Sequence, residues 1–299
     1  MKSLKTLLLV AVVFLSCREE NEKLSSAKIT SMDTLPKISA SDVKIGYAPV
    51  NGIQMYYEIH GSGKPLVLIH GGGSTIETSF SKLIPFFAKT RKVIAVELQA
   101  HGHTGDRDAP ESFEQDADDV AALLDYLKIR QADVLGFSNG GSTTLQMAMR
   151  HPELVTKIIP ISAIYKREGM QAFFWGFMEK GTFKDLPQVY KDAYSKINPD
   201  PEKLMNMYTK DRNRMLAFKD WNEEDVKTIK APVLLIVGDK DVVRPEHAFE
   251  IAKLLPQARV AIVPGAHGDF IGEAMSTDAE SKIPEATFLM IETFLNAGN

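Results

Sequence analysis

The sequence predicts an α/β fold in which helices cover a mostly parallel β-sheet. Short apolar runs alternate with segments of helical periodicity along most of the 299 residues. Several of these runs have no polar face, which is typical of buried parallel strands. The length allows one large domain with an insertion, and 44% hydrophobic and 25% charged residues are ordinary for a globular protein.

The N-terminus predicts an export signal. Lys2 and Lys5 precede the apolar stretch 7–15, which is too short to span a bilayer as a helix and has the length of a signal-peptide core. We therefore expect the protein to be exported.

The only cysteine, Cys17, ends this signal in a pattern that resembles a bacterial lipobox. We expect residues 1–17 to be a signal peptide with lipidation at Cys17, so that the lipid anchors the protein to a membrane in the periplasm or at the cell surface. A plain secretory signal with an incidental cysteine is the alternative. Residues 18–44 are rich in charged and small polar residues and predict a flexible tether.

The folded sequence is expected to begin with a β-hairpin. Asn51-Gly52 suits a type I′ turn between the runs 47–50 and 53–60. Further strands are predicted at 65–70, 92–98, 132–137, 155–162, 232–238 and 258–264. Helices are predicted at 79–89, 113–127, 140–150, 245–255 and 284–295. These segments assign residues 45–162 and 229–299 to the core.

The alternation stops at residues 163–228, which predict a helical cap. This segment holds 11 of the 25 aromatic residues and five of the 12 methionines. An inserted helical subdomain needs apolar contacts of its own, but an apolar cap would also suit the wall of a hydrophobic pocket. The cap residues that we expect to contact a substrate are Phe174, Trp175, Met178, Met207 and Trp221.

The run Gly136-Phe137-Ser138-Asn139-Gly140 predicts a nucleophilic serine. It matches G-x-S-x-G and lies between a predicted strand and a predicted helix, which is the context that a nucleophile elbow requires. Glycines suit this turn because it is tight and strained. A glycine-rich strand-to-helix loop is the alternative interpretation, and the context favours Ser138 as nucleophile.

A serine hydroxyl needs a base, which in this chemistry is a histidine held by a carboxylate. His267 follows the last predicted strand in a loop of small residues, whereas His247 falls within a helical pattern. We favour His267 as the base. Asp239 and Asp241 both follow a predicted strand, and we favour Asp241 because the first carboxylate of such a turn often caps it.

The glycine run 71–73 predicts donors for an oxyanion, because backbone amides are accessible where no side chain intrudes. We expect the amides of Gly72 and Asn139 to form this oxyanion hole. Gly73 is the alternative donor and is also expected to contact the substrate. We expect His70 to orient the loop by hydrogen bonding.

Taken in order, these motifs resemble the capped α/β-hydrolase superfamily from about Tyr47 to Asn299. The shared features are a His-Gly after the third strand, the serine motif, a cap after the sixth strand, Gly-Asp-x-Asp after the seventh and a histidine after the eighth. The resemblance implies an eight-stranded, mostly parallel sheet, no cofactor and an acyl-enzyme mechanism. One departure is the run 97–102, which lacks the arginine of the usual Asp-x-Arg-Gly-x-Gly.

A metal site is the other interpretation of this region. His101, His103 and Asp106 partly match the H-x-H-x-D-H pattern of metal-dependent lactonases, but the aspartate comes one position late and no histidine follows it. We expect no metal, and a polar loop near the mouth of the pocket instead.

These residues predict a serine hydrolase that cleaves a carboxylic ester or lactone. The apolar cap predicts a bulky, apolar substrate, such as a macrolide or another lactone. A carbon–carbon bond hydrolase, an aminopeptidase and a cofactor-free perhydrolase are alternatives on the same scaffold, and a non-catalytic binding protein is an alternative of another class. The net charge of −4 and the scattered lysines and arginines predict no nucleic-acid partner.

Overall fold

The computed structural model describes residues 43–276 and 278–298. The predicted signal peptide, the lipidation site Cys17 and the predicted tether up to residue 42 lie outside the described residues. Within the part of the chain that is described, no helix is long and apolar enough to cross a membrane.

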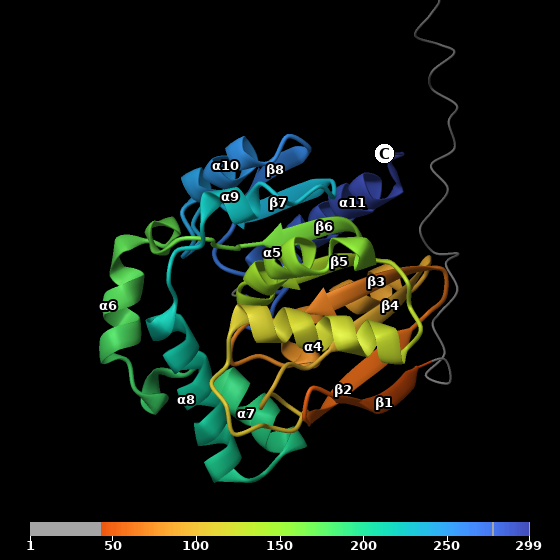
Figure 1. Cartoon of the computed structure of the whole chain (residues 1–299). Helices are drawn as coiled ribbons and strands as arrows, with labels where there is room; N and C mark the ends of the chain where they lie inside the picture. The colour runs from red at the N-terminus through yellow and green to blue at the C-terminus, as the bar shows by residue number, and fades with distance from the viewer. Residues whose placement is uncertain (1–42, 277, 299) are drawn as a thin grey trace, which may run out of the picture. The chain divides into compact units, whose positions relative to one another are not determined.

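An eight-stranded sheet runs through the centre of the fold, in the order β1-β2-β4-β3-β5-β6-β7-β8 (Figure 1). β1 pairs with β2 and β2 with β4 in antiparallel fashion, and all the other neighbours are parallel. The predicted eight-stranded, mostly parallel sheet is therefore confirmed. The strands are β1 (Lys44–Val50), β2 (Ile53–His60), β3 (Lys64–Ile69), β4 (Arg91–Val96), β5 (Ala132–Phe137), β6 (Val155–Ile161), β7 (Val233–Gly238) and β8 (Ala258–Val263).

The hairpin between β1 and β2 turns at Asn51 and Gly52, where φ is +41° and +89°. A type I′ turn needs positive φ at both central residues, which asparagine and glycine adopt at little cost. The pairing of Val50 with Ile53 closes the hairpin directly at this turn.

Helices cover both faces of the sheet because side chains alternate along each strand. Val67 and Ile69 of β3 pack in a cluster with helices α4 (Phe113–Tyr126), α5 (Asn139–Arg150) and α10 (Pro245–Leu254). Leu66 and Leu68 pack in a second cluster on the opposite face. That face is covered by α2 (Ile76–Phe80), α3 (Leu83–Phe87) and α11 (Ile283–Asn296).

The single helix predicted at 79–89 is wrong, because this segment forms the two short helices α2 and α3. The Thr75 side chain caps α2 and starts it earlier than predicted. Pro85 lies inside α3 and cannot donate a hydrogen bond to the carbonyl four residues before it. The missing hydrogen bond interrupts the helix between α2 and α3.

Four helices lie between β6 and β7: α6 (Ala172–Lys180), α7 (Gln188–Ile197), α8 (Pro201–Ala217) and α9 (Glu223–Val226). Figure 1 shows α6, α7 and α8 together on one side of the sheet and its covering helices. The prediction of a helical insertion after the sixth strand is confirmed. Its limits at residues 163 and 228 stay a prediction.

A buried ion pair joins the starts of β4 and β5. Arg91 Nη1 donates to Asp133 Oδ2 over 2.6 Å, and the two side chains are 4% and 0% exposed. The same guanidinium donates to Asn296 at the end of α11, over 2.9 Å. This contact fixes the edge of the sheet that lies opposite the carboxyl ends of the strands.

We predict that Asp133→Ala lowers the free energy of unfolding by about 3–5 kcal/mol, because it leaves Arg91 buried without its partner. The measurement is urea unfolding followed by circular dichroism. The matched control is Asp118→Ala, which removes a partly exposed partner of Arg150 and His151. That variant should lose only about 0–1 kcal/mol. Equal losses in both variants would contradict the prediction.

Candidate active site

Ser138 lies in a sharp turn between β5 and α5, with φ of +56° and ψ of −117°. Its amide donates to the Ile161 carbonyl over 2.9 Å, which holds the turn against β6. A Cβ on Gly136 would overlap the Gly140 carbonyl, and a Cβ on Gly140 would overlap the Ile69 carbonyl of β3. Both glycines of the motif are therefore needed for α5 to approach the sheet at this angle.

The structure brings Ser138, His267 and Asp241 into one hydrogen-bonded chain. His267 Nε2 lies 3.0 Å from Ser138 Oγ, and His267 Nδ1 lies 2.7 Å from Asp241 Oδ1. Asp241 is held in turn by the Ser162 hydroxyl at 2.6 Å and by the Val243 amide at 3.0 Å. All four distances are those of ordinary hydrogen bonds.

The electrostatics of the pair keep Asp241 ionised. Burial alone would raise the pKa of Asp241, but the charge of His267 and the hydrogen bonds to the carboxylate outweigh it and lower that pKa. Burial alone would lower the pKa of His267, and the Asp241 carboxylate outweighs it and raises that pKa. With Asp241 ionised, the His267 proton belongs on Nδ1, and Nε2 is left to accept from Ser138.

The two alternative residues of the sequence analysis lie elsewhere. Asp239 accepts from the Gly265 amide over 2.8 Å and so joins the loop after β7 to the loop after β8. His247 is buried and hydrogen-bonded to Glu250 over 2.8 Å. Neither contacts Ser138.

Gly72 and Asn139 flank Ser138 from two loops. A Cβ on Gly72 would overlap the Asn139 side-chain amide, so that a larger residue there would displace that amide. Asn139 is the first residue of α5, where backbone N–H groups have no partner within the helix. The Gly73 amide instead donates to Asp211, with His101 Nε2 3.3 Å away. This contact favours Gly72 over Gly73 as an oxyanion donor.

His70 has the contacts of an orienting residue. Its Nδ1 donates to the Gly71 carbonyl over 2.7 Å, and the Leu98 amide donates to its Nε2 over 3.0 Å. Burial, with the charge of His101 adding to it, lowers the pKa of His70 to about 3. The ring is therefore neutral and links residues 71–73, which we call the glycine loop, to the loop after β4.

A cavity of about 460 Å³ reaches Ser138 and His267 from the cap side. This volume lies in the range typical of small-molecule sites. The cap contributes mostly apolar side chains, among them Phe173, Phe174, Phe177, Met178, Leu186 and Met215. Gly73, Phe174 and Met178 line this cavity, and their contact with a substrate stays a prediction.

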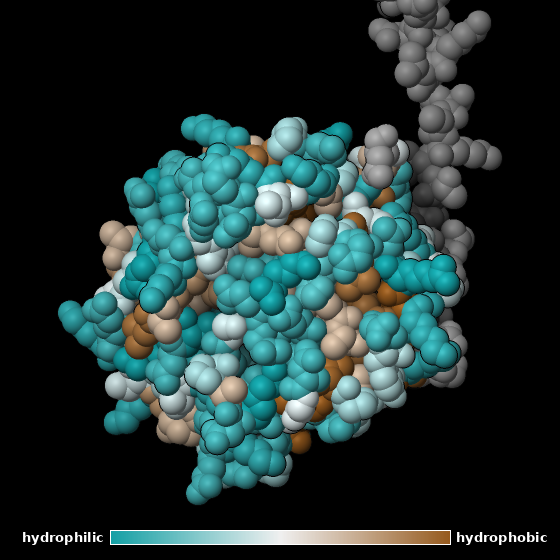
Figure 2. All heavy atoms as spheres, viewed as in Figure 1, coloured by the Kyte–Doolittle hydropathy of each residue, from teal (hydrophilic) through white to brown (hydrophobic). Residues whose placement is uncertain are grey.

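The rim of this cavity reaches the surface of the protein at α6. Phe173 and Phe177 line the cavity and are 65% and 52% exposed. Figure 2 shows hydrophobic residues over α6 at the left, and a further group of hydrophobic residues right of the centre of this view.

The expectation that Trp175, Met207 and Trp221 line the pocket is corrected by their packing. Trp175 donates to the Arg167 carbonyl over 2.9 Å and stacks on Phe218. The other two residues belong to the interior of the cap and its contact with the core. Trp221 packs edge-on against Phe113 and Phe218, and Met207 is fully buried with Ala100, Tyr194 and Leu204.

The two histidines of the H-x-H sequence bind separate carboxylates. His101 Nε2 lies 2.9 Å from Asp211 Oδ2, whereas His103 Nδ1 lies 2.9 Å from Glu97 Oε2. Gln99, at the position of the missing arginine, donates to Asp106 over 2.8 Å. No group of three or more His, Cys, Asp or Glu residues able to hold a metal occurs within residues 43–276 and 278–298.

The sequence of residues 64–274 matches the α/β-hydrolase fold family. This chain belongs to that family. The human serine hydrolase BPHL is 30% identical in an alignment of 237 positions, which covers 73% of this α/β-hydrolase and 78% of the relative. A 2-hydroxymuconate semialdehyde hydrolase of Pseudomonas sp. (strain CF600) is 34% identical over 134 residues, but this match spans only 42% of the chain and 47% of the relative.

Solved structures agree with this α/β-hydrolase fold. The enol-lactonase from Burkholderia xenovorans LB400 superposes with a TM-score of 0.68 at 21% identity, over 84% of this chain and all of that one. A membrane phospholipase A superposes with a TM-score of 0.68 at 20% identity, over 98% of this chain and all of that one. At these identities the likeness establishes the fold alone. The family and its relatives identify the protein as a hydrolase.

We predict that Asp241→Asn lowers the pKa of His267 by about 1–3, because an opposite charge within a few ångströms raises a histidine pKa by that amount. The measurement is an NMR titration of the seven histidines, with the His267 resonance assigned by its loss in His267→Gln. The matched control is Asp239→Asn, which should leave the His267 pKa nearly unchanged. A larger change in the control than in Asp241→Asn would contradict the assignment.

Proposed function

We propose that the protein is a serine hydrolase that cleaves a carboxylic ester or lactone through an acyl-enzyme. The observation that carries this proposal is the chain from Ser138 to His267 to Asp241, with contacts of 3.0 and 2.7 Å, at the floor of an apolar cavity. A nucleophile, a base and an orienting carboxylate are the three roles that acyl transfer needs.

In the first half of the reaction, Ser138 Oγ attacks the carbonyl carbon and its proton passes to His267 Nε2. The carbonyl oxygen becomes an oxyanion, which accepts hydrogen bonds from the amides of Gly72 and Asn139. The tetrahedral intermediate then collapses. The bond to the alcohol oxygen breaks, and His267 gives that oxygen the proton, so that an alcohol and an acyl-serine are formed.

In the second half, water replaces the alcohol. His267 takes a proton from the water as the water oxygen attacks the acyl carbon, and the same two amides hold the second oxyanion. The bond to Ser138 Oγ breaks, Oγ recovers its proton from His267, and the acid leaves. Asp241 stays ionised throughout and stabilises the histidine while it carries the proton.

The cavity supports an apolar, bulky substrate. Its cap wall is formed mainly by phenylalanine, methionine and leucine side chains, which bind by excluding water and impose few directional contacts. The exposed rim at Phe173 and Phe177 would accommodate a part of the substrate that extends out of the cavity. Lactones with large rings, including macrolides, have this combination of a carbonyl and an extended apolar surface.

Hydrolysis of a carbon–carbon bond is the second candidate function. It is favoured by the similarity to 2-hydroxymuconate semialdehyde hydrolase of Pseudomonas sp. (strain CF600). Such a reaction would use the same serine, histidine and aspartate with a carbon leaving group.

We also propose that the protein is exported and lipidated at Cys17. The support is the basic and then apolar N-terminal sequence that ends in Ser16-Cys17. An anchor there would leave the residues between Cys17 and β1 as a tether between the lipid and the hydrolase.

We predict that Ser138→Ala lowers nitrophenyl-ester turnover by at least about 10⁴-fold and abolishes labelling by a fluorophosphonate, because no other nucleophile replaces Oγ. The matched control is Ser62→Ala, which alters an exposed turn outside the site and should keep both activities. Turnover retained in a folded Ser138→Ala protein would contradict the mechanism.

A panel of esters, lactones and dienone ring-cleavage products separates the two candidate functions. We expect kcat/KM to be highest for an ester or lactone with an apolar acyl or alcohol part. A higher kcat/KM for a dienone would instead favour carbon–carbon bond hydrolysis. The measurement is initial rate against substrate concentration for each compound with the wild-type protein.

A further inference from the structure

Asp211 lies on cap helix α8, but its carboxylate contacts the core beside Ser138. Oδ2 accepts from the Gly73 amide and from His101 Nε2 at 2.9 Å. Oδ1 accepts from the Asn139 side-chain amide at 3.3 Å and from Arg214. One carboxylate of the cap thus joins the glycine loop, the turn around Ser138 and Asn139 (the nucleophile turn) and the loop after β4.

Two of the groups that donate to Asp211 lie next to the backbone amides that are proposed to hold the oxyanion. Gly73 is bonded to Gly72, and the Asn139 side chain belongs to the residue whose amide is the second donor. The space at Gly72 is also bounded by Asn139 and Asp211, since a Cβ there would lie 3.1 Å from Asp211 Oδ2. The separation between the two oxyanion amides therefore depends on where this carboxylate lies.

We propose that Asp211 is a positioning residue, which holds the amides of Gly72 and Asn139 in the geometry that an oxyanion requires once the cap is seated on the core. This inference rests on the proposed function, because it assigns a role within that mechanism. The carboxylate itself takes no part in the chemical steps of the reaction. It acts through the glycine loop and the nucleophile turn.

A carboxylate beside a developing oxyanion would oppose the reaction if its charge were not balanced. Here two cations face it. Arg214 is buried against Asp211. Burial alone would lower the pKa of His101, but the charge of Asp211 outweighs it and raises that pKa to about 9. His101 is therefore protonated at neutral pH, and Asp211 can hold the loop without leaving an unbalanced negative charge.

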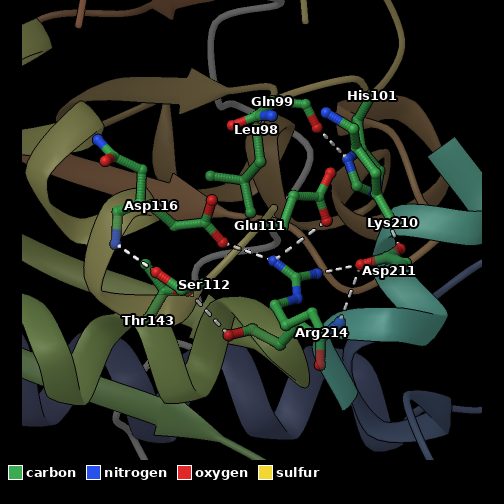
Figure 3. A network of polar contacts seen from close by, with 12 residues as sticks. Leu98, Gln99, His101, Glu111, Ser112, Asp116, Thr143, Lys210, Asp211 and Arg214 are labelled. Carbon is green, nitrogen blue, oxygen red and sulfur yellow. Dashed lines mark hydrogen bonds and ion pairs between the residues drawn. The ribbon is translucent and has the colours of Figure 1, made fainter. Parts of the chain in front are cut away.

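The remaining charges of the cluster are also close to balance. Figure 3 shows Arg214 between Asp211, Asp116 and Glu111. Arg214 Nη1 lies 2.6 Å from Asp116 Oδ2 and 3.7 Å from Glu111 Oε2. Burial raises the pKa of Glu111 to about 8, against the effect of Arg214, so that Glu111 is mostly neutral at pH 7. Asp211 and Asp116 then face Arg214 and protonated His101, two charges of each sign.

A second contact between α8 and the core provides a control. Lys210 Nζ lies 2.6 Å from Asp106 Oδ1, and the Asn206 amide donates to Asp106 Oδ2 over 2.8 Å. This contact joins the same cap helix to the loop after β4, but it does not involve the glycine loop. Weakening it loosens the cap without removing an acceptor from Gly73.

The experiment compares Asp211→Asn with Asp106→Asn on an ester substrate. The first substitution keeps the size of the side chain but removes the charge that holds Gly73 and His101. We expect kcat to fall about 10- to 100-fold with little change in KM, because displaced oxyanion donors weaken binding of the transition state and not of the substrate. Asp106→Asn should leave kcat within about twofold of the wild type.

An alkyl boronic acid provides the readout that distinguishes positioning from a merely structural role. It forms a tetrahedral adduct with Ser138 that needs the oxyanion donors, whereas the product alcohol has no carbonyl oxygen to place there. In Asp211→Asn we expect the inhibition constant of the boronic acid to rise by about the same factor as kcat falls. The affinity for the product alcohol should stay within about twofold.

The outcomes separate the two proposals. Unchanged kcat and boronic acid affinity in a folded Asp211→Asn protein would overturn the role of Asp211, and so would equal losses in Asp106→Asn. If the wild-type protein itself is not labelled by a fluorophosphonate at Ser138, the proposed function fails instead.

A second variant covers the case in which Asp211→Asn does not fold. His101→Gln keeps a donor toward Asp211 but removes the charge. It should show the same pattern with a smaller loss of kcat, and full wild-type kcat and boronic acid affinity in this variant would overturn the inference.

Discussion

The site depends on one backbone constraint, the positive φ of Ser138 between β5 and α5. This turn requires that nothing larger than hydrogen stand at Gly136 and Gly140, because each would otherwise meet a backbone carbonyl. Once the turn is formed, Ser138 Oγ stands at the carboxyl edge of the sheet. The loops after β3, β7 and β8 begin at the same edge, which is why Gly72, Asp241 and His267 lie around it.

The cap adds a constraint of a different kind. Part of its contact with the core is apolar, as in the packing of Trp221 on Phe113, and such contacts tolerate small shifts. Asp211 and Arg214 are instead buried charges, which are stable only with all their partners in place. The apolar cap wall of the proposed hydrolase can thus adjust to different apolar substrates. The buried polar contact, in contrast, fixes the position of α8 beside the glycine loop.

Much of the fold and of the candidate site could be predicted because the signals are local. The strand pattern and the motifs around Ser138 and His267 each lie within a few residues of sequence. The sequence could not predict the packing of Trp175, Met207 and Trp221 in this way. It shows that these side chains are apolar, but not whether they contact the cavity or the interior of the cap. Asp211 was missed because its contacts with Gly73, His101 and Asn139 span 138, 110 and 72 residues.

The central claim is that Ser138 forms a tetrahedral adduct whose oxygen is held by Gly72 and Asn139. The most direct measurement is a crystal structure of the protein with an alkyl boronic acid bound. The account predicts boron bonded to Ser138 Oγ, one boronate oxygen about 2.7–3.1 Å from the amides of Gly72 and Asn139, and the Gly73 amide still donating to Asp211. Boron bonded to another residue, or a boronate oxygen held by groups other than these amides, would contradict it.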